Sequence, residues 1–153
     1  MASTLKTELG IHKDTLPIIA QSRLKDFKAL WKAQRHHAAV YMAGFAVEAY
    51  LKCAICTALD AEQLPKIFEY HDLESLLFYS GLMQKMANDD EVRPSFGAIK
   101  NIWRVEMRYE DPARSKIDHA TCQNMDVWLN DSKKGVLPWI RRRARQRKNS
   151  SPS

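Results

Sequence analysis

One stretch of the chain, residues 38–59, is apolar on nearly every side of the helix that it would form. It contains no proline, one weak helix former, Gly44, and only three clearly polar side chains, Glu48, Lys52 and Thr57. A helix of this kind must be buried on most sides or lie in a membrane. Each of its two charged side chains would cost about 2–3 kcal/mol at the centre of a bilayer. The stretch therefore predicts the central helix of a helical bundle outside a membrane.

Apolar residues at helical spacing predict further helices on both sides of this stretch. A first amphipathic helix is expected over residues 16–33. His71-Asp72-Leu73 opens another, with Asp72 as its N-cap and Gly81 at its end, and a further helix begins at Pro94.

A last helix is expected to start within residues 115–118 and to be kinked at Gly135 and Pro138, because proline removes a helical hydrogen bond. No alternating pattern of a β-strand is found. We therefore predict an all-α, up-and-down bundle of four to five helices over residues 15–140. A flexible N-terminus (1–14) precedes it, and a basic, disordered tail (141–153) follows.

The positive charge of the chain is concentrated in that tail. The net charge is +6, with 24 Lys and Arg against 18 Asp and Glu. Six basic residues and no acidic one follow position 140, which leaves the body balanced; they are Arg141, Arg142, Arg143, Arg145, Arg147 and Lys148. Such a segment can bind RNA, DNA or another acidic surface by neutralising phosphates. The alternative is a helix end that frays into a solubilising tail.

The cysteines and the N-terminus favour a cytoplasmic protein. Three cysteines are an odd number, and the first 14 residues contain no apolar core of a secretion signal, so reduced thiols are expected. Cys53 and Cys56 are interpreted as core residues of the central helix. The adjacent His36 and His37 point to different faces of a helix, so no metal and no cofactor are predicted.

Three motifs in order resemble the HEPN family (higher eukaryote and prokaryote nucleotide-binding domain). They are AGFAVEAYLK (43–52), LPKIFEYHDLESLL (64–77) and WRVEMRY (103–109). The resemblance implies a four-to-five-helix bundle of HEPN type that commonly forms a homodimer. It also implies a toxin–antitoxin, phage-defence or nucleotidyltransferase-partner setting, in which some members are ribonucleases and others are catalytically silent.

Active members of that family carry an Arg and, after four to six intervening residues, a His. Arg114 and His119 match this spacing, with polar Ser115 after the Arg. A His can act as general acid or base in RNA cleavage, and an Arg can stabilise the charged phosphorane. In the alternative alignment, Arg108 and Tyr109 occupy the motif position, and no His follows Arg108 at the required distance.

Two functional hypotheses follow from these alignments. The first is a non-catalytic interaction module associated with nucleotides or nucleic acid, acting as a homodimer or beside a nucleotidyltransferase-like or antitoxin partner. The second is a metal-independent ribonuclease that uses Arg114 and His119 and holds RNA with the basic tail. Glu48 must be paired with Lys52 or Arg108, because an unpaired buried carboxylate is very costly. With Tyr109, these residues form either a structural pairing or a dimer cleft or ligand pocket.

Overall fold

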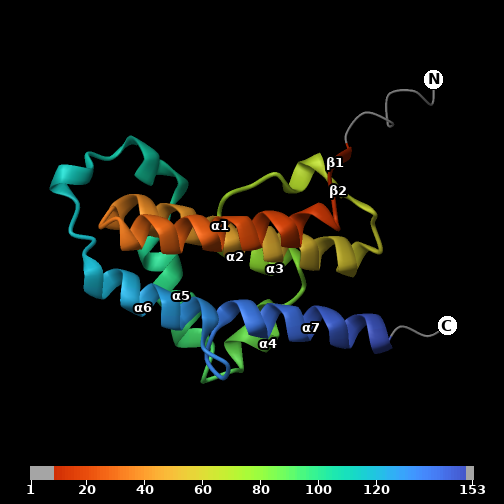
Figure 1. Cartoon of the computed structure of the whole chain (residues 1–153). Coiled ribbons are helices and arrows are strands. Elements are labelled where there is room, and N and C mark those ends of the chain that lie inside the picture. Colours follow the sequence, from red (N-terminus) through yellow and green to blue (C-terminus); the bar gives the residue numbers. More distant parts are fainter. Residues whose placement is uncertain (1–8, 151–153) are drawn as a thin grey trace.

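A computed structural model describes residues 9–150 as a predominantly helical bundle built around one long helix (Figure 1). Its α-helices are α1 (Thr15–Lys32), α2 (His36–Leu59), α3 (Leu73–Tyr79), α4 (Met83–Ala87), α5 (Arg93–Ile102), α6 (His119–Asn130) and α7 (Val136–Ser150). Short 3-10 helices are η2 (Lys66–Phe68), η3 (Val105–Tyr109) and η4 (Pro112–Arg114), and the two strands are β1 (Leu9–His12) and β2 (Gln63–Pro65). The all-α prediction is thereby confirmed.

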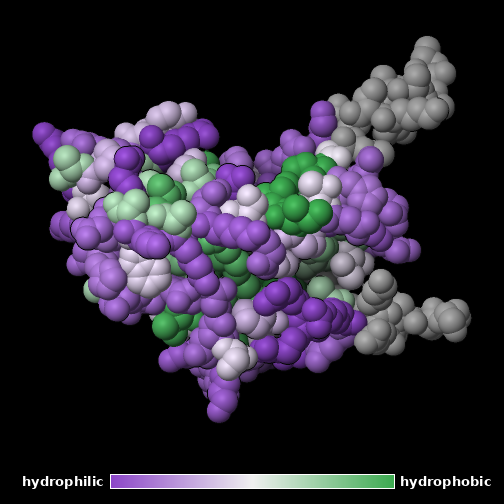
Figure 2. Space-filling view, viewed as in Figure 1, coloured by the Kyte–Doolittle hydropathy of each residue, from purple (hydrophilic) through white to green (hydrophobic). Residues whose placement is uncertain are grey.

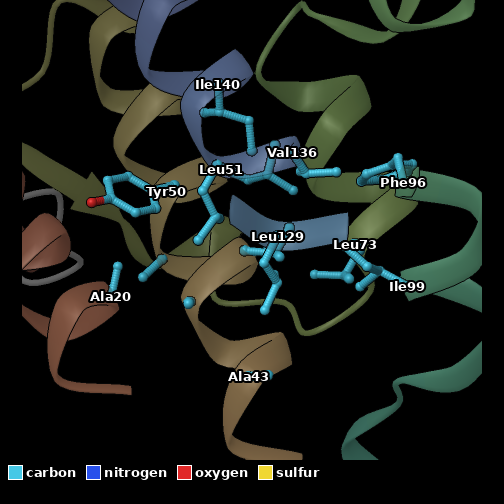
Figure 3. Close-up of a cluster of buried hydrophobic side chains, with 14 of the residues drawn as sticks. Ala20, Ala43, Tyr50, Leu51, Leu73, Phe96, Ile99, Leu129, Val136 and Ile140 are labelled. Carbon is cyan, nitrogen blue, oxygen red and sulfur yellow. The ribbon is translucent and has the colours of Figure 1, made fainter. Parts of the chain in front are cut away.

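Helix α2 is the core of the bundle, as its composition predicts. It packs against α1, α3, α6 and α7, and most of its side chains are buried. Figure 3 shows its Ala43, Tyr50 and Leu51 among apolar side chains of α3, α5, α6 and α7. The helix is long and apolar enough to span a bilayer by length and composition alone, but it is mostly buried inside the bundle.

Gly44 lets a tryptophan lie directly against α2. A Cβ atom at Gly44 would come within 2.2 Å of three ring carbons of Trp103. The Trp103 indole is buried, donates from Nε1 to the carbonyl oxygen of Tyr41 at 2.8 Å, and meets the Phe45 ring edge-on at 5.1 Å. The glycine that weakens the helix locally is therefore required by the packing of the chain after α5.

The C-terminal part of the bundle differs from the prediction of one kinked helix. Helix α6 ends at Asn130 and α7 begins at Val136, so two helices follow one another along one side of the molecule (Figure 1). Asp131 organises the connection, because its Oδ1 accepts from the backbone N–H groups of Lys133 and Lys134 at 2.9 and 3.0 Å. Pro138 produces no kink: it is the third residue of α7, where a helix has no partner for the backbone N–H.

The ends of the chain also differ from the sequence interpretation. Residues 9–12 of the expected flexible N-terminus form β1, which pairs antiparallel with β2, a small sheet that the sequence analysis missed. Residues 141–150 of the expected disordered tail continue α7 as helix. Residues 1–8 and 151–153 lie outside the described part of the chain.

Candidate functional site

His119 is the first residue of α6, where a capping box fixes the chain. Asp118 Oδ1 accepts from the Thr121 backbone N–H at 2.9 Å, and Thr121 Oγ1 accepts from the Asp118 backbone N–H at 3.2 Å. The Thr121 backbone N–H, followed by its hydroxyl, holds the pKa of Asp118 below its usual range. The imidazole of His119 is thus placed on a rigid helix start, and it remains exposed to solvent.

His119 lines an open pocket between the end of α1 and the start of α6, which we call the histidine pocket. The pocket has a volume of about 420 Å³ and is lined by Lys28, Trp31, Lys32, Gln34, His36 and His119. The rings of His36 and His119 are 6.2 Å apart. Two imidazoles and two lysines therefore face a space in which a phosphate group would be electrostatically favoured.

The hydrogen bond from Trp31 decides which nitrogen of His119 carries a proton. Trp31 Nε1 donates to His119 Nδ1 at 2.9 Å. An indole N–H only donates, so Nδ1 is the acceptor and the proton of the neutral ring lies on Nε2. In this arrangement neutral His119 can donate a hydrogen bond from Nε2, whereas a general base must use Nδ1, which Trp31 already occupies.

Arg114 lies in different surroundings from His119. It belongs to η4, its side chain is 90% exposed, and its Nε is 3.8 Å from Asp111 Oδ2. It does not line the histidine pocket. Ser115, which follows it, is bound to a buried side chain. The two residues of the predicted catalytic pair therefore do not converge on one space within this chain.

That buried side chain is His37, which the sequence analysis did not select. Its Nδ1 is 2.8 Å from Ser115 Oγ and its Nε2 is 3.0 Å from the carbonyl oxygen of Met107. Since a carbonyl can only accept, Nε2 carries the proton and Nδ1 accepts from the Ser115 hydroxyl. Ser115 Oγ in turn accepts from the Ile117 backbone N–H at 3.2 Å. His37 therefore anchors the segment that leads to α6.

Glu48 forms an ion pair with Lys52 and a hydrogen bond with His71. Its Oε1 is 2.6 Å from His71 Nδ1 and its Oε2 is 3.6 Å from Lys52 Nζ. The predicted pairing with Lys52 is confirmed. His71 directly precedes Asp72, which caps α3 as predicted by accepting from the Ser75 backbone N–H.

Arg108, the other predicted partner of Glu48, is instead exposed, and its guanidinium lies 4.8 Å from the centre of the Tyr109 ring. Tyr109 is 78% exposed. Both belong to η3, and within this chain neither lines the pocket that Glu48 and Lys52 line.

The basic segment of α7 is anchored by four apolar side chains at its start. Val136, Leu137, Trp139 and Ile140 are buried. The arginines that follow are held by aromatic rings and uncharged oxygens. Arg141 lies 5.5 Å from the centre of the Tyr50 ring, Arg143 lies 5.5 Å from that of Trp139, and Arg142 Nη1 donates to the Ser132 carbonyl at 3.2 Å.

Carboxylates do not neutralise these side chains. Within the part of the chain whose side chains are described, Arg141, Arg142, Arg143 and Arg145 form no ion pair. Arg143 does lie near Asp89. Burial raises the pKa of Asp89, but hydrogen bonds from Trp139 and from two backbone amides outweigh it and, with Arg143, hold that pKa below its usual range. The side chains of Arg147 and Lys148 lie outside the described set.

The cysteines are free thiols. Cys56 and Cys122 are buried, and burial raises the pKa of each to about 11. Cys53 is half-buried, and burial raises its pKa as well. Among the described residues, no group of three or more His, Cys, Asp or Glu side chains could hold a metal ion.

Comparison of the chain with protein-family models, with curated proteins and with solved structures gives no match. The HEPN resemblance thus remains a prediction from the three sequence motifs.

Proposed function

We propose that this chain is a non-catalytic nucleic-acid-binding module that holds a phosphate backbone with the basic end of α7. The single observation that carries the proposal is the surplus of positive charge on that helix. The arginines from Arg141 to Arg145 lie on regular helix, and the described part of the chain offers them no carboxylate in an ion pair.

The arrangement suits phosphate contacts for three reasons. Arg141 and Arg145 are four residues apart and so share a face of the helix. Cation–π contacts restrain Arg141 and Arg143 without removing their charge. A planar guanidinium binds a phosphate through two parallel N–H donors, which a lysine cannot do. As in the sequence analysis, we propose that the module works as a homodimer or beside an antitoxin or nucleotidyltransferase-like partner.

Salt-dependent binding tests the proposal. We would measure the affinity of the full chain for a fluorescent single-stranded RNA and for duplex DNA between 50 and 200 mM salt, a range in which phosphate contacts lose much of their strength. Replacing Arg141, Arg142 and Arg145 by Gln removes three charges from α7. Each lost phosphate contact lowers the slope of log affinity against log salt by about 0.7 for a single strand. We therefore expect a slope smaller by about 2.

A charge-matched control separates this surface from a general charge effect. Lys25, Lys66 and Lys116 are exposed, lie outside α7 and do not line the histidine pocket. Replacing them by Gln removes the same number of charges. If both triple variants lose affinity equally, or if neither RNA nor DNA binds, the assignment to α7 is wrong.

The histidine pocket supports a second candidate function, a metal-independent ribonuclease. His36 and His119 face one space with Lys28 and Lys32 at its edge. Cleavage of RNA in the presence of EDTA that is lost in both His119→Asn and His36→Asn, but kept in His12→Asn, would favour this function. His12 is a matched control because it lies on β1, outside the pocket, beside Asp14 and Glu62.

A further inference from the structure

A second pocket lies between α1 and α2, on the face that carries β1. We call it the α1–α2 pocket. Its volume is about 310 Å³, and most of its wall is apolar. Its lining includes Ile11, Leu16, Ile19, Tyr41, Phe45 and Ala49. Figure 2 shows hydrophobic surface where β1 and the beginning of α1 lie.

Two charged side chains of α2, Glu48 and Lys52, complete the wall of this apolar pocket. Their side chains are only 11% and 9% exposed. In the described part of the chain, the one polar contact of the Lys52 ammonium is with Glu48 Oε2 at 3.6 Å, which is beyond hydrogen-bond distance. An ammonium group has three N–H donors, and those of Lys52 make no hydrogen bond to the described residues. Lys52 is thus positioned to receive an acceptor from the pocket.

Two cationic side chains, Arg23 and Lys52, and one carboxylate, Glu48, line this wall. Glu48 is shared between Lys52 and His71, which approaches its other oxygen at 2.6 Å. Arg23 also lines the pocket, and its Nε is buried with no hydrogen-bond partner among the described residues. The Arg23 guanidinium is 3.4 Å from Asp26 at its Nη1, so Nε is left as a second donor at the wall.

These observations select the chemistry of an occupant. Apolar and aromatic walls favour a hydrocarbon or aromatic body, while Lys52 and Arg23 favour one anionic group. A polyphosphate would place several negative charges next to the Glu48 carboxylate, and a pure hydrocarbon would leave the Lys52 donors without acceptors. A monoanion satisfies both conditions.

We propose that the α1–α2 pocket binds a small apolar monocarboxylic acid whose carboxylate accepts hydrogen bonds from Lys52 Nζ. The volume of about 310 Å³ lies at the lower end of the range for ligand sites. This site is independent of α7 and of phosphate binding.

Calorimetric titration of the full chain with octanoate tests the assignment, with octanol as the neutral probe of similar length. We expect octanoate to bind saturably at one site and octanol to bind about tenfold more weakly or not at all. Lys52→Met keeps the length of the side chain but removes its charge, and should weaken octanoate binding by about tenfold. Thermal melting checks that this variant is folded.

A pair of surface variants keeps the test decisive if Lys52→Met does not fold. Ile11 lines the pocket and is 40% exposed, so it can be replaced with little effect on the core. Ile11→Glu places a carboxylate at the pocket and should weaken octanoate binding, whereas Ile11→Lys should not. His119→Asn, in the histidine pocket, should leave octanoate binding unchanged.

Three results would overturn the proposal. The first is equal affinity for octanoate and octanol, and the second is equal behaviour of Ile11→Glu and Ile11→Lys. The third is a wild-type chain that forms a dimer, an Ile11→Glu variant that is a monomer, and no binding of octanoate to the dimer or to the monomer. The pocket would then be part of an interface between two copies of the chain. Loss of RNA binding in α7 variants would have no bearing on any of them.

Discussion

Replacing Gly44 by Ala tests how closely the Trp103 ring packs against α2. In an exposed helix this substitution stabilises by about 1 kcal/mol, because alanine has the higher helix propensity. Here the added Cβ would lie 2.2 Å from three ring carbons of Trp103, which no side chain tolerates. The Trp103 ring must move by more than 1 Å to restore ordinary contacts of about 3.5 Å.

The expected loss of stability follows from the contacts that hold the Trp103 ring in place. Overpacking in a core costs about 1–3 kcal/mol. Displacing the ring also breaks the bond from Trp103 Nε1 to the Tyr41 carbonyl at 2.8 Å, which leaves a buried donor unpaired at a cost of about 1–3 kcal/mol. After subtracting the gain in helix propensity, we expect Gly44→Ala to lower the free energy of unfolding by about 3 kcal/mol.

Urea denaturation, followed by far-UV circular dichroism, measures this difference. The matched control is Gly97→Ala in α5, where a Cβ meets no atom within 4 Å and a small stabilisation is expected. The double variant Gly44→Ala with Trp103→Leu should recover part of the loss, since the clash has been removed. A Gly44→Ala protein as stable as the wild type would refute the reasoning.

Three further predictions concern buried or capping groups. His37→Leu should lower the free energy of unfolding by about 2–4 kcal/mol, measured by urea denaturation, because both of its hydrogen-bond partners lose a bond inside the protein; an unchanged midpoint would contradict the assigned network. Cys56 and Cys122 should react with Ellman's reagent at pH 8 only after unfolding, because burial raises their pKa to about 11. Since those pKa values are higher in the folded than in the unfolded chain, their contribution to stability is complete below about pH 8.5 and declines as the pH rises toward 11; replacing both residues by Ala should remove that part of the decline. The pKa of Asp118 is lowered in the folded chain, so its contribution is present above about pH 4 and is lost as the pH falls below that value. Asp118→Asn should remove this acid dependence of the melting temperature, and an unaltered dependence would show that the cap does not titrate.

The sequence predicted the helices of the bundle well where local pattern alone decides them. The apolar stretch at α2, the Asp72 cap and the helix beginning beside Pro94 were each visible in a few neighbouring residues. The break before α7 was missed because proline was assumed to lie inside a helix. Its effect depends on its position, and in the first turn of α7 Pro138 costs nothing. The pairing of β1 with β2 was missed because three or four residues are too few to show alternation.

The candidate sites depended more strongly on contacts between distant segments. Glu48 was expected to be paired with Lys52 or Arg108, and the structure pairs it with Lys52. Its pairing with His71 comes from the packing of the segment before α3 on α2, which no local pattern shows. His37 was missed for the same reason, because its partners Met107 and Ser115 lie about seventy residues further along the chain.

The order of the elements also has a consequence for how the protein is made. Helices α1 and α2 are joined by only three residues and pack against each other, so this hairpin can form early from contacts that are close in sequence. The other side of α2 is covered by α6 and α7, which are the last helices to be synthesised. Until α6 and α7 emerge from the ribosome, α2, the most apolar helix of the chain, is covered by α1 but not by these two helices. During translation, an apolar face of α2 therefore stays uncovered until α6 and α7 have been made, and such a face is prone to aggregation.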